Sequence, residues 1–155
     1  CLYVGIMITK SGPKVVEFNC RFGDPETQAV LPVLEGDLLG LLYSAANGEI
    51  DSSKVWYENA AAVSVVAASQ GYPGKYEKGF EIHGLNSVKG NSFVFHAGTE
   101  FKENKTLTTG GRVLAVTSMD SNGNLRSAIE SAYTEIKKIS FDNIYYRKDI
   151  GHKAL

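Results

Sequence analysis

The sequence predicts an α+β fold, and three features of its pattern point to this class. Two β-rich segments separated by a turn open the chain, two segments with helical spacing follow, and a series of short β segments is closed by one long amphipathic helix. Strands and helices are grouped instead of alternating, which is typical of α+β folds. We expect a β-hairpin plus helices in residues 1–50 and a small mixed β-sheet domain with one long helix in residues 51–155.

The opening β-rich segments predict a hairpin. Residues 2–9 and 14–19 are rich in valine, isoleucine and phenylalanine, which favour strands. The residues between them, 10–13, read KSGP and form a typical turn cluster. Two strands with so short a connection pair most simply as antiparallel neighbours.

Two helices are predicted after the hairpin. Leucine, valine and alanine recur at three- and four-residue spacing in residues 25–34 and again in residues 36–47. Gly48 is a good helix stop. Both helices can then pack on the hairpin, and this first unit ends near residue 50.

The second unit begins after a surface linker at residues 51–54. Small residues and valine in residues 60–69 predict a buried strand. Residues 124–139 carry apolar side chains at helical spacing and predict one amphipathic helix. Further short β segments are expected at residues 80–84, 92–97, 100–102, 106–108 and 112–120.

Composition excludes several classes of protein. The formal net charge of -1, from 16 Lys and Arg and 17 Asp and Glu, gives no general electrostatic reason to bind nucleic acid or an acidic membrane. No apolar run is long enough to cross a bilayer, and no leader pattern opens the chain. We therefore expect a cytoplasmic protein without nucleic-acid or membrane partners.

The two cysteines, Cys1 and Cys20, match no zinc pattern and are expected to stay reduced inside a cell. Because the chain opens at Cys1 without methionine and enters an apolar run at once, we expect it to be a fragment of a longer protein.

The most informative stretch for chemistry is residues 17–21. On a strand, Glu17 and Asn19 lie two residues apart and therefore point to the same side of the sheet. A carboxylate and an amide oxygen form a hard oxygen site of the kind that suits Mg²⁺. Arg21 extends the series, and its guanidinium can pair with phosphate oxygens. The alternative is a solvent-facing strand with Arg21 in a salt bridge, and the spacing alone favours it.

Residues 23–26, which read GDPE, favour a functional site over the solvent-facing strand. Gly23 allows an unusual backbone turn, Asp24 can cap a helix, and Pro25 suits the first helical position. A strand that delivers charged groups to the start of a helix is a common way to build an anion site.

Together these residues resemble a known family. The run RFGDPETQ at residues 21–28 is similar to the signature of the glycinamide ribonucleotide synthetases, and EFN at residues 17–19 is similar to the metal-binding strand of ATP-grasp enzymes. The resemblance continues in GYPG at 71–74, VFHAGT at 94–99, TGGRVLAVT at 109–117 and YRKDIG at 146–151. Several ordered matches are more specific than one motif, and they place the chain at the C-terminal end of such a synthetase, beginning inside the ATP-grasp core.

The resemblance implies a reaction and a role for each site residue. Glycine is joined to phosphoribosylamine with ATP as co-substrate, through a glycyl phosphate. Glu17 and Asn19 then hold Mg²⁺ or Mn²⁺, and Arg21 stabilises the phosphoryl group. Asp24 and Glu26 position the amine, accept its proton or cap the helix, and these alternatives stay open.

Arg112 follows a double glycine in TTGGR, which lets the backbone approach a ligand or forms a hairpin turn. The resemblance makes Arg112 a candidate for the sugar-phosphate end of the substrate. It also implies that the fragment alone is inactive and that its partner is the N-terminal remainder of the same enzyme.

The remaining candidates favour structural roles. GYPG at 71–74 lacks P-loop spacing and is better explained as a turn. His96 is expected in the core or at a sheet edge, and Arg147 and Asp149 are as well explained by a local salt bridge. Lys153 stands where the family usually has arginine. Two rival functions remain, namely another ATP-grasp carboxylate-amine ligase or carboxylase, and a non-catalytic binding module.

Overall fold

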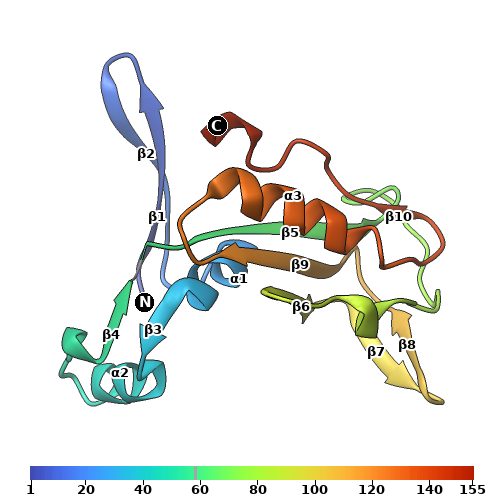
Figure 1. The fold of residues 1–155 in the computed structure, drawn as a ribbon, viewed down its shortest axis with the longest axis horizontal. Coiled ribbons are helices and arrows are strands. Elements are labelled where there is room, and N and C mark those ends of the chain that lie inside the picture. The colour runs from blue at the N-terminus through green and yellow to red at the C-terminus, as the bar shows by residue number, and fades with distance from the viewer. Residues whose placement is uncertain (58) are drawn as a thin grey trace.

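The computed structural model describes residues 1–57 and 59–155, and its strands form one four-stranded sheet and three two-stranded ribbons (Figure 1). This arrangement confirms the predicted α+β class. Within those two ranges, no helix has the length and apolar character needed to cross a membrane.

The predicted hairpin is present. Strands β1 (Tyr3–Thr9) and β2 (Gly12–Asn19) are antiparallel, with Tyr3 opposite Asn19, and the pair projects away from the rest of the molecule (Figure 1). Gly12 has a φ of 95°, which explains the glycine in this tight connection. Apolar side chains of the hairpin are exposed, such as Ile8 at 79% and Phe18 at 65%.

The two predicted helices are shorter than expected. Helix α1 (Glu26–Val30) gives way to a 3₁₀ turn, η1 (Leu31–Val33), because Pro32 has no N–H to continue α-helical bonding. Helix α2 (Leu38–Ala46) starts two residues later than expected, and Asp37 caps it by accepting a hydrogen bond from the Gly40 N–H.

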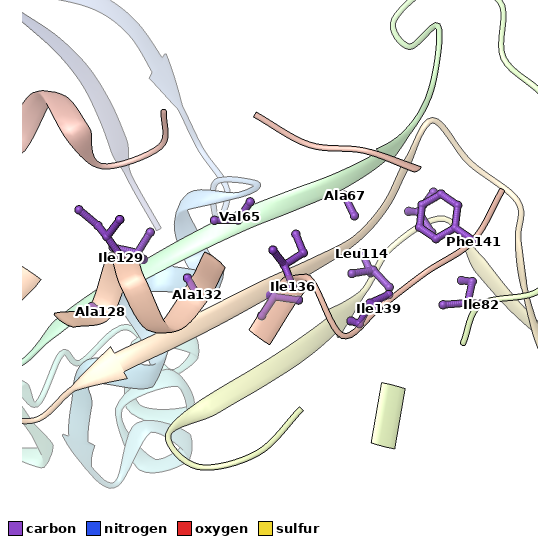
Figure 2. Packing of buried hydrophobic residues seen from close by; sticks show 13 residues of the cluster. Val65, Ala67, Ile82, Leu114, Ala128, Ile129, Ala132, Ile136, Ile139 and Phe141 are labelled. Carbon is purple, nitrogen blue, oxygen red and sulfur yellow. The ribbon is translucent and has the colours of Figure 1, made fainter. Parts of the chain in front are cut away.

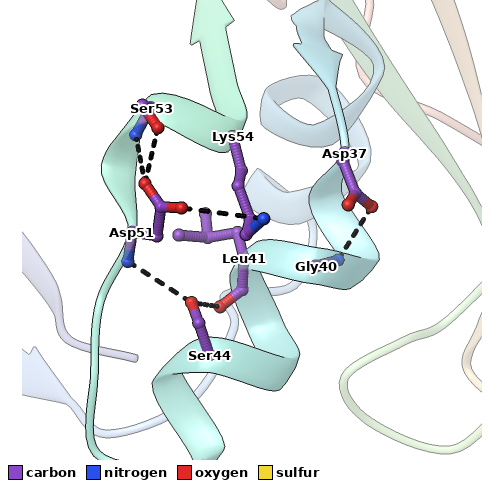
Figure 3. A network of polar contacts seen from close by, with 7 residues as sticks. All are labelled: Asp37, Gly40, Leu41, Ser44, Asp51, Ser53 and Lys54. Atoms are coloured by element: carbon purple, nitrogen blue, oxygen red, sulfur yellow. Dashed lines mark hydrogen bonds and ion pairs between the residues drawn. The ribbon is translucent and has the colours of Figure 1, made fainter.

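A short ribbon that was not predicted joins residues on both sides of residue 50. Strand β3 (Leu34–Gly36) pairs with β4 (Val55–Tyr57), and the expected linker folds into the 3₁₀ turn η2 (Ser52–Lys54). Asp51 accepts from the backbone N–H and the hydroxyl of Ser53 and lies 3.6 Å from Lys54 Nζ (Figure 3). The boundary between residues 50 and 51 stays a prediction, and this pairing crosses it.

The four-stranded sheet forms the body of the second unit. Its strands are antiparallel and run in the order β10 (Ile144–Tyr145), β5 (Ala61–Ser69), β9 (Arg112–Asp120) and β6 (Ser92–His96). The predicted bounds of β9 are confirmed, and β10 was not predicted. Beside this sheet, β7 (Thr99–Lys102) and β8 (Lys105–Thr108) form a small hairpin.

The expected strand at residues 80–84 is reduced to two isolated bridges, from Glu81 to Leu107 and from His83 to Ser140. Two further 3₁₀ turns follow β5 along the chain, η3 (Leu85–Ser87) and η4 (His152–Ala154).

Helix α3 (Leu125–Ile136) lies across β5 and β9 and closes the core (Figures 1 and 2). It ends three residues earlier than predicted, and Asn124 caps it by accepting from the Ser127 N–H. Buried apolar side chains from both layers meet here, including Val65, Leu114 and Ile136. Alternate residues of β5, such as Ser64 and Val66, point to the opposite face, toward Pro25.

Candidate active site

The loop between β2 and α1 is held by close packing around Gly23. A side chain at this position would place its Cβ 2.5 Å from Glu26 Oε2, so only glycine fits without rearrangement. The Gly23 carbonyl oxygen accepts hydrogen bonds from the Thr27 N–H at 3.1 Å and from the Thr27 hydroxyl. This tight turn fixes the direction in which Asp24 leaves the loop.

Asp24 does not cap α1, which corrects the expectation from sequence. Pro25 occupies the N-cap position, and no side chain of residues 1–57 or 59–155 forms a capping hydrogen bond with the helix. The Asp24 carboxylate instead contacts two other residues. Arg112 Nη2 lies 2.9 Å from its Oδ2, and Gln28 Nε2 donates to its Oδ1 at 2.8 Å.

Arg112 reaches Asp24 from a distant part of the sequence, at the first residue of β9. Its Nη1 also donates to the Asp24 carbonyl oxygen at 3.0 Å, so one edge of the guanidinium holds both the carboxylate and the backbone of the loop. The Arg112 and Asp24 side chains are 41% and 44% exposed. An ion pair this exposed adds little stability, so its main consequence is the orientation of the two groups.

Glu26 faces a different neighbour, the hydroxyl of Tyr3 on β1. The Tyr3 hydroxyl donates to Glu26 Oε1 at 3.4 Å. The Glu26 carboxylate raises the pKa of Tyr3, with smaller contributions from burial and from the Glu17 carboxylate. Glu17 and Glu26, which lie on different elements, are therefore both close to one phenol at the base of the hairpin.

Glu17 and Asn19 lie at the end of β2, as predicted. Glu17 is exposed opposite Gly5, and Asn19 is half-buried opposite Tyr3. A carboxylate and an amide oxygen fit Mg²⁺, which keeps few protein ligands and takes other oxygens from phosphate and water. No group of three or more His, Cys, Asp or Glu side chains gathers into a metal centre within residues 1–57 and 59–155. The assignment of Glu17 and Asn19 as metal ligands therefore stays a prediction.

Arg21 lies beyond the strand, because β2 ends at Asn19. The extended series expected from Glu17 to Arg21 therefore stops two residues early. Arg21 is exposed, and its Nη1 donates to the carbonyl oxygen of Phe22 at 3.0 Å.

The glycines before Arg112 are packed against protein. A Cβ at Gly111 would overlap the Tyr72 ring, and one at Gly98 would lie 2.5 Å from the Gly110 Cα. The GYPG loop thus contacts the turn that precedes Arg112. This packing explains both the GYPG motif and the double glycine as structural features. The turn interpretation of residues 71–74 agrees with this packing.

A hollow of about 270 Å³ adjoins Arg112 on the face of the sheet away from α3. Its walls are largely apolar, and the Oγ of Ser64 in them is buried without a hydrogen-bond partner among the described residues. Its lining includes Pro25, Val66, Tyr72, Arg112, Tyr146 and Arg147.

Two other predictions concern Arg147, which lines this hollow, and His96 on β6. Arg147 forms the local salt bridge with Asp149, with donor to acceptor distances of 2.9 and 2.6 Å. His96 lies on the edge strand β6, exposed, with its Nδ1 2.9 Å from the Thr99 hydroxyl.

Comparison with known protein families identifies the chain. The model for the C domain of phosphoribosylglycinamide synthetase matches residues 62–153, and the model for its ATP-grasp (A) domain matches residues 1–27. The chain belongs to the phosphoribosylglycinamide synthetase family. Glu17, Asn19, Arg21, Asp24 and Glu26 fall within the A-domain match, and Arg112 falls within the C-domain match.

Named members of the synthetase family are similar over almost the whole chain. The phosphoribosylamine–glycine ligase of Caldanaerobacter subterraneus is 54% identical over 97% of this chain, which spans 35% of that protein. The human trifunctional purine biosynthetic protein adenosine-3 is 51% identical over 99% of this chain, which spans 15% of it. A crystal structure of phosphoribosylamine–glycine ligase from Thermotoga maritima has a TM-score of 0.77 and 32% identity, covering 96% of this chain and 36% of that one.

Three residues of the synthetase chain were missed by sequence reasoning, namely Tyr3, Gln28 and Tyr72. The position of Gln28, four residues after Asp24, was a usable signal because the first turn of a predicted helix from residue 25 brings Gln28 near the residue just before it. Tyr3 follows from hairpin register, since the residue opposite Asn19 must lie beside the end of β2. Tyr72 is fixed by contacts between distant loops, which leave no local signal.

Proposed function

We propose that the enzyme containing this chain joins glycine to phosphoribosylamine and converts ATP to ADP and phosphate. The observation that carries this proposal is the 54% identity, over 97% of the chain, to a protein named phosphoribosylamine–glycine ligase. In the reaction, a glycine carboxylate oxygen takes the γ-phosphoryl group of ATP. The amine of phosphoribosylamine then attacks the acyl carbon, and inorganic phosphate leaves as glycinamide ribonucleotide forms.

Glu17 and Asn19 are the proposed ligands of Mg²⁺ or Mn²⁺. Both lie at the end of β2, and both carry hard oxygen donors. A divalent ion held there neutralises phosphate charge while the phosphoryl group is transferred. Arg21 follows directly, and its exposed guanidinium is suited to the oxygens of the transferring phosphoryl group.

Asp24 and Glu26 are assigned different roles because their surroundings differ. Both carboxylate oxygens of Asp24 are engaged, one by Arg112 and the other by Gln28, so Asp24 is suited to holding Arg112 in place. Among the described residues, the Glu26 carboxylate accepts one long hydrogen bond, from the Tyr3 hydroxyl at 3.4 Å, so it is better placed to accept the amine proton.

Arg112 is proposed to bind the sugar-phosphate end of phosphoribosylamine. Asp24 occupies one edge of its guanidinium, which leaves the Nε–H and further N–H groups for an anion. The adjoining hollow of about 270 Å³ offers space for a substrate beside this arginine.

The exposed hairpin is proposed to pack against the N-terminal remainder of the same enzyme. The chain spans about a third of the length of its bacterial relatives, such as 35% of the Caldanaerobacter ligase. Ile8, Val16 and Phe18 are more than half exposed, and contact with the rest of an ATP-grasp core would bury them. We place this enzyme in the cytoplasm, with residues 1–50 in its ATP-grasp domain and residues 51–155 in its C-terminal domain.

Calorimetric titration of the full-length enzyme with ATP in the presence of Mg²⁺ tests this function. We expect binding by the wild type and binding weakened about tenfold or more by Asn19→Ala, since a lost metal ligand weakens the bridging ion. Asn86→Ala is a matched control, because Asn86 is an exposed residue of η3 in the C-domain match. Absence of binding by the wild type would support a non-catalytic module.

A further inference from the structure

Gln28 is held in an arrangement that simple packing does not explain. Its Nε2 donates to Asp24 Oδ1 at 2.8 Å, while its Oε1 is buried and has no hydrogen-bond partner among the described residues. Burying an unpaired acceptor destabilises the folded state. A leucine or methionine would fill the same space without burying an unpaired acceptor. The amide N–H, which donates to Asp24, is therefore the feature that explains a glutamine at this position.

The amide N–H completes the contacts around Asp24. Arg112 Nη2 approaches Oδ2 and Arg112 Nη1 approaches the Asp24 carbonyl oxygen, which leaves Oδ1 for Gln28. With only the arginine contacts, the carboxylate could rotate about its χ2 torsion, which has a broad energy profile. A second donor on the other oxygen stops this rotation and thereby fixes the direction of the guanidinium.

Helix α1 carries Gln28 and attaches this contact to the sheet. It packs on β5, and the Gln28 amide reaches back past the start of the helix to Asp24 in the preceding loop. Arg112 begins β9, which pairs with β5 in the same sheet. Donor, carboxylate and guanidinium are thus attached to elements that pack together.

We propose that Gln28 is a positioning residue that acts through Asp24 to aim the Arg112 guanidinium at the anionic end of the substrate. This inference rests on the proposed function, since it assigns Arg112 to substrate binding. Removing the amide N–H should loosen Arg112 and weaken capture of phosphoribosylamine more than it slows the chemical step.

The first test needs no substrate and uses the 155-residue chain. Nitrogen-15 NMR reports rotation of the Arg112 guanidinium, which we expect to be faster in Gln28→Leu than in the wild type. Gln70→Leu is the matched control, because Gln70 is the chain's other glutamine and has an exposed side chain. Unchanged rotation in Gln28→Leu would overturn the proposal, whatever reaction the enzyme catalyses.

The second test uses the full-length enzyme. For Gln28→Leu we expect KM for phosphoribosylamine to rise about tenfold while kcat stays within about threefold, because binding energy common to substrate and transition state is lost. An unchanged KM would contradict this role. A wild-type enzyme that forms no glycinamide ribonucleotide would reject the proposed function and leave the NMR result to decide on Gln28.

A pH series with Gln28→Glu separates positioning from a purely structural role. At pH 8 the new carboxylate repels Asp24, and we expect KM for phosphoribosylamine to rise about thirtyfold. Near pH 5 the two carboxyl groups can share a proton, and this KM should return to within about threefold of the wild-type value. The charged and titratable groups facing this position are Asp24, Arg112 and, across a neighbouring hollow, His96.

The same pH series with Gln28→Leu is the control, because it measures every pH effect that does not depend on the introduced carboxylate. Equal, pH-independent losses in Gln28→Glu and Gln28→Leu, together with lowered melting temperatures, would show that Gln28 serves only the fold and would overturn the proposal.

Discussion

Residues 1–57 and residues 59–155 both contain large apolar side chains, but these are mostly exposed in the first region and form a buried core in the second. Among residues 1–57, Gly23 alone is buried, and large apolar side chains such as Ile8 and Leu39 are 79% and 78% exposed. In residues 59–155, α3 and the four-stranded sheet enclose a continuous core around Leu114 and Ile136. The second region can therefore account for its own stability, whereas the first has apolar surface left to bury.

The proposed site residues and the buried core lie mostly in different regions. Five of the six proposed site residues lie in the first region, and only Arg112 comes from the second. The Asp24–Arg112 contact joins the two regions at an exposed position. Mutations of the site residues in either region should therefore affect turnover or substrate binding with little effect on folding, whereas mutations of the buried core residues in the second region should lower stability.

The largest expected effect is on turnover, from Glu17→Ala in the full-length enzyme. Loss of a metal ligand should lower kcat by about 10³-fold, comparable to the loss of a strong electrostatic contact in a transition state. The melting temperature should not change, because Glu17 is exposed. Glu49→Ala, also exposed in the first region, serves as the control. Near-normal turnover in Glu17→Ala would remove the metal assignment.

The second effect is on stability, from Leu114→Ala in the 155-residue chain. Leu114 is 1% exposed, and truncation of such a core leucine lowers the free energy of unfolding by about 2–5 kcal/mol. Leu39→Ala, at an exposed position of α2, should change it by less than about 0.5 kcal/mol. Urea unfolding followed by circular dichroism measures both. Equal losses would mean that the first region has a core of its own.

The smallest effect is a pH dependence. Backbone N–H groups of Asn124 and Asn122 and the Ser127 side chain lower the pKa of Asp120, with the Asn124 contribution the largest. A lowered pKa stabilises the folded state above the usual aspartate range, and this contribution is lost as the pH falls through the folded-state pKa. Asp120→Asn should therefore be less stable than wild type at pH 7 and approach it near pH 3.

Asp51→Asn gives the matching comparison in the first region. Hydrogen bonds from Ser53 lower the pKa of Asp51, with its hydroxyl contributing most. Because η2 lies outside the core, this change should leave the urea midpoint of the main transition unchanged at both pH values. A shift as large as that of Asp120→Asn would show that the two regions unfold together.

Local patterns predicted the elements that depend on local chemistry. The hairpin follows from two β-rich runs around a turn, and β9 and α3 follow from apolar runs with clear periodicity. The strands β4 and β10 were missed because each is two or three residues long and exists through a partner elsewhere in the chain. Helix α1 was overextended because its apolar spacing continues past the point where Pro32 ends it.

In the candidate site, too, contacts between neighbouring residues could be predicted and contacts between distant residues could not. Glu17 and Asn19 could be predicted together because strand geometry relates neighbouring residues. The contact between Asp24 and Arg112 joins residues 88 positions apart, and the packing of Tyr72 on Gly111 joins two loops. Such contacts depend on tertiary structure, which one sequence read alone does not specify.

Hydrogen exchange tests the central distinction between the two regions most directly. In the 155-residue chain, backbone amides of β5 and β9 should exchange at least about 10³-fold more slowly than those of β1 and β2, because only the former belong to an enclosed core. In the full-length enzyme, the amides of β1 and β2 should become protected as well. Equal protection of all four strands in the 155-residue chain would contradict the account.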